Sequence, residues 1–203
     1  MDLKKNPELI PLIEWWEKDG KSTVIMLLVA AVAVGGWYGW KAHRASVRAA
    51  AADAVANAYT TAELEEAATR FAGQPVAGVL KIRLAKSYYD AGKYQEALDC
   101  YEALAKDAPD GFADIPAVGR AQCLEALKKF AEAAKAFDDF AKANPDSYLA
   151  LTARLGAARS VAQGGDGKAA LERLAAIKKD VGDDELAKTR VEATEMAVKR
   201  IAK

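Results

Sequence analysis

Two segments of the sequence repeat each other in register. Residues 84–109 read LAKSYYDAGKYQEALDCYEALAKDAP, and residues 120–145, which lie 36 positions further on, read RAQCLEALKKFAEAAKAFDDFAKANP. The coinciding positions are Tyr94 with Phe130, Ala97 with Ala133, Tyr101 with Phe137, and Pro109 with Pro145. A small residue lets two helices cross closely, an aromatic residue four positions later packs against the partner helix, and proline ends a helix. The repeat therefore predicts helix hairpins that stack on one another.

The first copy resembles the tetratricopeptide repeat. Its residues at the signature positions are Leu84, Tyr88, Gly92, Tyr94, Ala97, Tyr101 and Pro109. The usual repeat is about 34 residues long, so the longer spacing indicates an insertion, most simply within residues 110–116. The second copy is degenerate, because Lys128 stands where the first has Gly92. The resemblance implies a short right-handed solenoid, in which each helix pair buries its apolar face against its neighbours.

The remaining sequence fits an all-α fold. Alanine is abundant after residue 42, and Ala-rich segments with Leu, Glu and Lys favour helices because Ala loses no side-chain entropy on folding. Thr61 is expected to cap a short helix that ends near Ala72. We expect one helical domain over residues 41–203, with the best repeats at 81–109 and 117–145, a weaker unit at 150–178 and a capping helix at 184–202.

The first helix of each hairpin is expected to line the inner surface of the stack. In the first hairpin this places Lys86, Tyr89 and Asp90 on the concave face, and in the second it places Gln122 and Glu125 there. Such surfaces hold extended or helical segments of other proteins. Any one of these residues also fits a solvated polar position on a helix.

One uninterrupted apolar segment precedes the repeats. Residues 22–40 read STVIMLLVAAVAVGGWYGW and carry no charge. At about 1.5 Å per residue, a helix of this length matches the hydrocarbon thickness of a bilayer. Flanking aromatic rings and cations suit the two interfaces, and they are Trp15, Trp16, Trp37, Tyr38, Trp40, Lys18, Lys21, Lys41 and Arg44. We therefore expect a single transmembrane helix at 22–40 behind a short leader at 1–21.

Two alternatives compete with the membrane anchor. A cleaved signal peptide needs a short basic start and small residues at the cut site, whereas here about twenty polar and aromatic residues come first and the run ends in Trp-Tyr-Gly-Trp. A buried core helix seldom needs apolar residues on every face. Within the segment, Ala31, Gly35 and Gly39 form a small-residue stripe suited to a homodimer or to docking on a membrane complex. Such spacing also arises by chance in an Ala- and Gly-rich run.

Charge and reactive residues argue against several functions. Lys plus Arg equals Asp plus Glu at 29 each, so there is no basic field for nucleic acid. The single histidine, His43, flanks the apolar segment, and no Cys/His cluster has metal-ligand spacing. We therefore expect no enzyme activity, cofactor or metal. Cys100 and Cys123 fit either buried apolar positions or one disulfide between neighbouring helices.

The layout resembles the YfgM-like family of bacterial inner-membrane proteins. The residues that carry this resemblance are the anchor at 24–40, the Ala-rich helix at 50–59 and the repeat at 84–109. The resemblance implies an ancillary subunit of the Sec translocon, with a cytoplasmic N-terminus and a periplasmic domain that helps to pass envelope proteins to chaperones. An envelope scaffold in cell division or outer-membrane assembly is the alternative. Flanking cations decide little about orientation, with four before the span and three after it.

Overall fold

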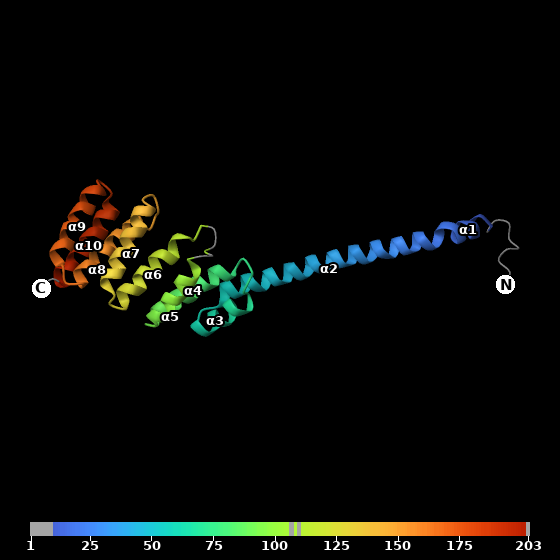
Figure 1. Ribbon diagram of the computed structural model, residues 1–203, viewed down its shortest axis with the longest axis horizontal. Coiled ribbons are helices and arrows are strands. Elements are labelled where there is room, and N and C mark those ends of the chain that lie inside the picture. The colour runs from blue at the N-terminus through green and yellow to red at the C-terminus, as the bar shows by residue number, and fades with distance from the viewer. Residues whose placement is uncertain (1–9, 106–107, 109–110, 202–203) are drawn as a thin grey trace. The chain divides into compact units, whose positions relative to one another are not determined.

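The computed structural model describes residues 10–105, 108 and 111–201 of the chain, and every regular element in those ranges is a helix (Figure 1). The chain divides within one long helix into two compact units, Met1–Asp53 and Ala54–Lys203. The sequence-based boundary between anchor and helical domain lies earlier, after residue 40. Several predicted features fall outside the described residues, namely residues 1–9 of the leader, Pro109, Asp110 and the end of the capping helix at Ala202.

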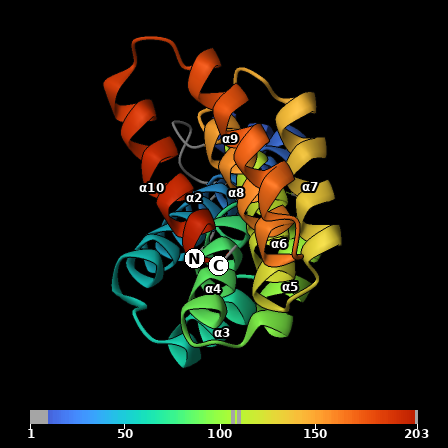
Figure 2. The same ribbon diagram turned by 90° about the vertical axis from the view of Figure 1, so that its left-hand side faces the viewer.

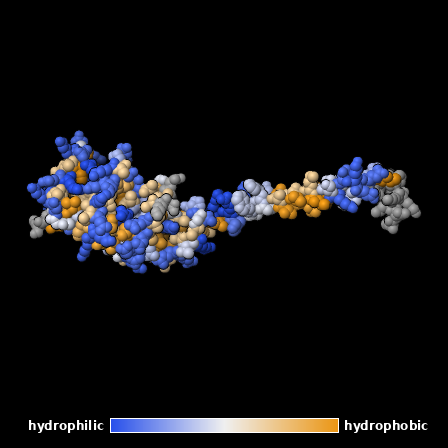
Figure 3. Space-filling model, in the orientation of Figure 1, coloured by the Kyte–Doolittle hydropathy of each residue, from blue (hydrophilic) through white to orange (hydrophobic). Residues whose placement is uncertain are grey.

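The first unit consists of helix α1 (Ile10–Trp15), a π-helical turn η3 (Trp16–Gly20) and most of helix α2 (Lys21–Asn57). Every residue of α2 from Val24 to Ser46 is exposed, so its apolar side chains have no protein layer to pack against. No charged residue occurs from residue 22 to residue 40, so the apolar side chains occupy all sides of the helix, and Figure 3 shows them as a hydrophobic band on the face in view. By length and composition, α2 is the one helix within the described residues that could cross a membrane.

The π-helical turn was not anticipated from the sequence. The Trp16 ring lies over Gly20, where a Cβ atom would come within 2.7 Å of the ring. Because π-helical turns widen the backbone locally, glycine at this position leaves room for the indole. The side chain of Thr23 adds a hydrogen bond to the carbonyl oxygen of Asp19 at 2.9 Å.

The second unit is a stack of antiparallel helices (Figures 1 and 2). Helix α3 packs on α4, and three hairpins follow: α4 with α5, α6 with α7, and α8 with α9. Helix α10 contacts α8 and α9 and closes the stack, and Figure 2 shows α8 between α7 and α10. The bounds are Thr61–Arg70 for α3, Ala77–Asp90 for α4, Tyr94–Leu104 for α5, Asp114–Ala126 for α6, Phe130–Ala143 for α7, Ala150–Gln163 for α8, Gly167–Asp180 for α9 and Glu185–Ile201 for α10.

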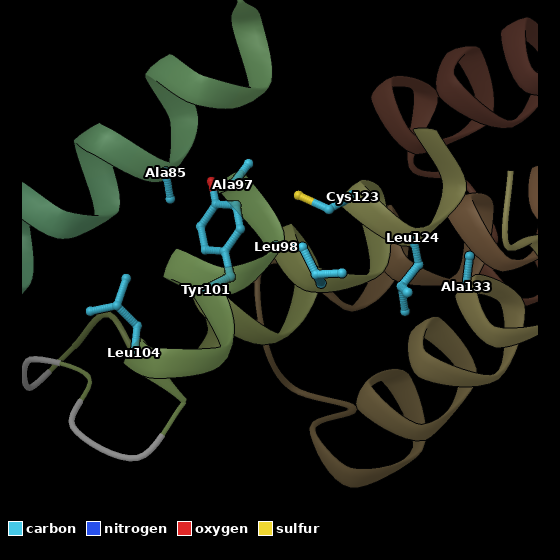
Figure 4. Packing of buried hydrophobic residues seen from close by; sticks show 8 residues of the cluster. All are labelled: Ala85, Ala97, Leu98, Tyr101, Leu104, Cys123, Leu124 and Ala133. Carbon is cyan, nitrogen blue, oxygen red and sulfur yellow. The ribbon is translucent and has the colours of Figure 1, made fainter. Parts of the chain in front are cut away.

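The repeated small and large residues form the core of this stack. The second helix of each hairpin has a fully buried alanine in its first turn, and these residues are Ala97, Ala133 and Ala170. The large residue four positions later is Tyr101, Phe137 or Leu174, and each is buried too. Figure 4 shows the Tyr101 ring close to Ala97, with Ala85 of α4 and Cys123 of α6 in the same cluster. The weak third unit therefore keeps the packing pattern of the other two.

Each aromatic core residue also packs on a glycine of the following hairpin. A Cβ atom at Gly119 of α6 would lie 2.5 Å from the Tyr101 ring, and one at Gly156 of α8 would lie 2.7 Å from the Phe137 ring. Atoms at such distances overlap, so only glycine lets α6 and α8 approach the preceding ring this closely. These two ring–glycine contacts join successive hairpins.

The turns inside the three hairpins share one geometry. Gly92, Lys128 and Gly165 occupy matching positions with φ angles of 76°, 62° and 101°. In each turn the next residue donates its backbone N–H to a carbonyl five positions earlier: Lys93 to Tyr88, Lys129 to Leu124, and Asp166 to Val161. This is the helix-ending motif that glycine favours. The degenerate repeat thus keeps its turn at the cost of a left-handed lysine.

The cap of α3 differs from the expectation by one residue. Thr60, not Thr61, caps the helix: its side chain accepts from the N–H of Glu63, while the Glu63 carboxylate accepts from the N–H of Thr60. This reciprocal arrangement requires Glu three positions after the cap, and only Thr60 satisfies that spacing. These hydrogen bonds lower the pKa of Glu63 below its usual range.

Candidate functional site

The first helices of the three hairpins lie next to one another, because α4 contacts α6 and α6 contacts α8. In a stack of hairpins these helices form the inner layer. The candidate groove residues lie on two of them: Lys86, Tyr89 and Asp90 on α4, and Gln122 and Glu125 on α6. Successive first helices thus provide the surface on which these side chains can meet.

Lys86 and Asp90 pair with each other. The ammonium nitrogen Nζ of Lys86 lies 2.6 Å from a carboxylate oxygen of Asp90, one helical turn away. Both side chains are more than half exposed, so the pair contributes little to stability. Its charged groups therefore remain available to a partner at almost no cost to the fold.

Glu125 behaves differently, because it is buried and fully engaged. Its side chain is only 9% exposed, and its two carboxylate oxygens accept from Nε and Nη2 of Arg159 on α8, at 2.5 and 2.6 Å. This two-pronged geometry is the strong form of a carboxylate–guanidinium pair. The hydrogen bond to Glu125 raises the pKa of Arg159 further above its usual value. The pair neutralises both charges and joins α6 to α8.

Arg159 is a site residue that sequence reasoning missed. Arg159 follows Gln122 by 37 positions, and Gln122 follows Lys86 by 36. The turns at residues 92, 128 and 165 are separated by the same two intervals, so Lys86, Gln122 and Arg159 occupy matching places in successive first helices. The signal was the repeat period itself. The third unit lacks the aromatic signature of the first two, so the sequence alone does not extend the predicted groove to its first helix.

Tyr89 lies close to this ion pair. Its side chain is half-buried, and burial raises the pKa of its hydroxyl, with the negative charge of Glu125 adding to the effect. The ring meets that of Tyr94 edge-on, with centroids 5.2 Å apart, a favourable aromatic geometry. Gln122 is half-buried on the same helix as Glu125. The inner layer therefore offers an aromatic ring, an amide and a neutralised ion pair.

A second concavity lies among α3, α4 and α5. It has a volume of about 660 Å³ and a mostly apolar lining that includes Ala68, Leu84, Cys100 and Ala103. Tyr88 stands at this concavity and donates a hydrogen bond to Glu65 at 2.7 Å, which raises the pKa of the tyrosine to about 12. The hydroxyl therefore stays protonated at any ordinary pH.

The two cysteines are free in the structure. Cys123 is completely buried in the cluster around Leu98 and Tyr101, and burial raises the pKa of its thiol to about 12. Cys100 is half-buried against the same cluster. The sequence left open a buried apolar thiol or a disulfide, and in the structure Cys123 is a buried apolar thiol.

The small-residue stripe of α2 faces open space. Ala31, Gly35 and Gly39 are exposed, and a Cβ atom at either glycine would have no atom within 4 Å. The predicted homodimer or docking contact through this stripe stays a prediction. The contrast with Gly119 and Gly156 is clear, since those glycines are already occupied by aromatic rings.

Two protein families match the sequence. A family described as tetratricopeptide repeat matches residues 82–148, and one described as tetratricopeptide repeat-like domain matches residues 14–111. No curated protein matches the chain in sequence.

Among solved structures, the chain is similar to the TPR-like repeats of a putative kinesin light chain from Podosopora anserina. The TM-score is 0.56 at 17% identity, and the match covers 70% of this chain and 76% of that one. At this identity the likeness concerns the fold alone. The two family matches, the helix hairpins described above and this likeness in fold together support a tetratricopeptide-repeat protein.

Proposed function

We propose that this protein is a membrane-tethered interaction module, in which α2 spans the bilayer and the inner layer of α4, α6 and α8 binds a segment of another protein. Tetratricopeptide repeats indicate protein–protein interaction, and this fold typically serves as a non-catalytic scaffold. The observation that carries the proposal is the set of polar and aromatic side chains that successive first helices present, with Tyr89, Gln122 and the Lys86–Asp90 pair accessible on α4 and α6.

The chemistry of this groove favours a polypeptide over a strongly charged ligand. Glu125 and Arg159 cancel each other's charge, and so do Lys86 and Asp90. A nearly neutral surface with amide, phenol and ion-pair groups can exchange hydrogen bonds with a peptide backbone, and Tyr89 adds an amphipathic ring of the kind enriched at interfaces. The balanced composition of the whole chain agrees with this choice.

The tether gives the groove its location. Every residue from Val24 to Ser46 is exposed, and an apolar helix without protein partners is stable where lipid surrounds it. Confinement to the membrane surface raises the effective concentration of the groove near membrane partners. The tetratricopeptide repeat-like match begins at residue 14 and runs to 111, which supports treating the apolar helix and the first repeat as one functional unit.

The resemblance to the YfgM-like family suggests the specific setting. In that setting the chain is an ancillary Sec translocon subunit of the bacterial inner membrane, with its stack in the periplasm and envelope proteins or chaperones as partners. Purification of the intact chain in mild detergent should then recover translocon components. Recovery of cell-division or outer-membrane-assembly proteins instead would replace the translocon role with the envelope scaffold.

The groove itself is tested by site-specific photo-crosslinking in cells. A photoreactive residue at Tyr89 or Gln122 should capture a discrete partner protein. The matched control is Lys135, which lies on the second helix α7 with its side chain 76% exposed. Equal capture from Lys135, or capture from neither groove position, would contradict binding on the inner layer.

A further inference from the structure

One face of α2 carries a basic and aromatic stripe immediately beyond the apolar segment. Trp37, Lys41, Arg44 and Arg48 follow one another at intervals of four, three and four residues, which places them on the same side of a helix. All four side chains are exposed. We call these four residues, together with Trp40, the post-span stripe.

Contacts between these side chains order the stripe. The guanidinium carbon of Arg44 lies 4.7 Å above the Trp40 ring, and the centroids of Trp40 and Trp37 are 5.5 Å apart. A stacked guanidinium is attracted by the ring's negative face, and it keeps its N–H donors free at the edge. The three side chains thus form a ladder from the apolar segment to the charged one.

The two ends of the apolar segment differ in charge. Before it, Glu14, Glu17 and Asp19 outnumber Lys18 and Lys21. After it, no acidic residue follows until Asp53, so Lys41, Arg44 and Arg48 are three uncompensated positive charges in one short stretch. Such a cluster directly beyond a transmembrane helix has the charge and position to meet lipid phosphates.

We propose that the post-span stripe binds the headgroup of an anionic phospholipid. Trp37 and Trp40 hold the helix at the depth of the lipid carbonyls. Arg44 then donates two parallel hydrogen bonds to the phosphate, while Lys41 and Arg48 contribute charge on either side of it. The proposal rests on the tether function, because the stripe reaches headgroups only if α2 spans the bilayer.

The test measures which lipids the full-length chain retains. The protein is reconstituted into vesicles of equal parts phosphatidylcholine and phosphatidylglycerol and extracted in mild detergent, and its bound lipids are counted by native mass spectrometry. The native chain should be enriched in phosphatidylglycerol. Each cation near an anionic surface contributes roughly a fivefold preference, so Arg44→Gln should lower the enrichment about fivefold and the triple variant Lys41→Gln/Arg44→Gln/Arg48→Gln should abolish it.

The matched control is Lys18→Gln/Lys21→Gln, which removes two cations from the other end of the segment. It should keep the enrichment, and inorganic phosphate added to the detergent should not displace the lipid. Equal enrichment in the native chain and the triple variant would overturn the proposal, and so would loss of enrichment in the control or displacement by free phosphate.

Resistance of the native chain to extraction by alkaline carbonate tests the membrane tether separately from the lipid-binding stripe. Failure to insert would overturn the tether together with the stripe. Insertion without enrichment in phosphatidylglycerol would overturn the stripe alone.

Discussion

The two apolar regions of this protein treat the same residue types in opposite ways. In α2, Leu27 and Leu28 are 64% and 61% exposed, whereas in the stack Leu80 and Leu104 are almost completely buried. The reason is the pattern around the helix axis. Each helix of the stack has one apolar face and one polar face, whereas α2 is apolar on all sides. A neighbouring helix packed on one side of α2 would therefore leave its other apolar sides exposed. One region carries its own apolar environment, and the other leaves its apolar side chains exposed, as the proposed membrane span requires.

The largest expected effect on stability comes from replacing one glycine in each of the two regions with valine. Gly156→Val would drive a side chain into the Phe137 ring and should lower the free energy of unfolding by about 3 kcal/mol, because overpacked cores relax only by moving helices. Gly36→Val in α2 meets no atom within 4 Å and should leave the stack unchanged. Urea unfolding followed by circular dichroism compares the two. Similar losses from both variants would mean that Gly36 is also packed.

The stability of the protein at high pH tests whether water reaches the buried Tyr101 hydroxyl of the stack. Burial raises the pKa of Tyr101 to about 12 from an ordinary value of 10. The folded state thus favours the neutral phenol, so its stabilising contribution is complete below pH 10 and is lost as the pH rises to 12. The full shift corresponds to roughly 2–3 kcal/mol.

Tyr101→Phe keeps the ring and should flatten the alkaline fall in stability by about this amount. Tyr148→Phe, in which the replaced ring is 68% exposed, is the control and should follow the native curve. The measurement is the urea midpoint at several pH values between 9 and 12. An alkaline fall unchanged by Tyr101→Phe would show that water reaches the hydroxyl.

The ion pair between α6 and α8 extends the comparison of the stack with α2 to charged residues. Removing Arg159 leaves the nearly buried Glu125 carboxylate without its partner, whereas Arg44 of α2 has no buried partner to lose. Arg159→Leu should therefore cost about 1.5 kcal/mol, reduced from the value for a fully buried pair because Arg159 is itself 36% exposed. Adding Glu125→Gln should recover part of the loss. A double-mutant cycle without coupling would contradict the observed pairing.

The smallest effect distinguishes the repeats from one another. Lys128 holds a φ of 62° that glycine adopts without strain. Lys128→Gly should raise the free energy of unfolding by about 0.5–1 kcal/mol, the strain relieved exceeding the added freedom of the unfolded chain. Gly92→Lys, the reverse change in the first hairpin, should lower it by a similar amount. Both shifts are read from thermal unfolding, and a destabilised Lys128→Gly would indicate that the lysine side chain stabilises the turn.

The hairpins were predictable because their signals are local and repeated. Ala97, Ala133 and the aromatic residues four positions on report helix crossing directly in the sequence. The contacts between hairpins were not predictable in the same way. Gly119 and Gly156 carry meaning only once the ring that meets each is known, and Arg159 only once the third repeat is in register. The π-helical turn at Trp16–Gly20 depends on the packing of aromatic rings, which no sequence pattern predicts.

The candidate groove likewise has some features that the sequence predicts and others that depend on tertiary contacts. Placing Lys86, Tyr89 and Asp90 on one helix needed only the helical period, and α4 carries all three. The state of Glu125 required tertiary structure, because a carboxylate at that position is either a free ligand group or a buried partner, depending on what α8 brings to it. Sequence patterns specify which face a residue occupies, but not whether its charge is already satisfied.

The most direct test of the central claim is the depth of the four tryptophans in a membrane. In a Trp15→Phe/Trp16→Phe variant reconstituted into vesicles, fluorescence reports Trp37 and Trp40 alone, and the opposite double variant reports Trp15 and Trp16. A spanning α2 predicts that both pairs are quenched most by lipids brominated near the headgroup, at opposite interfaces. Absence of quenching by brominated lipid for both pairs, or strongest quenching from bromines at the chain ends, would contradict a repeat stack tethered by a transmembrane helix.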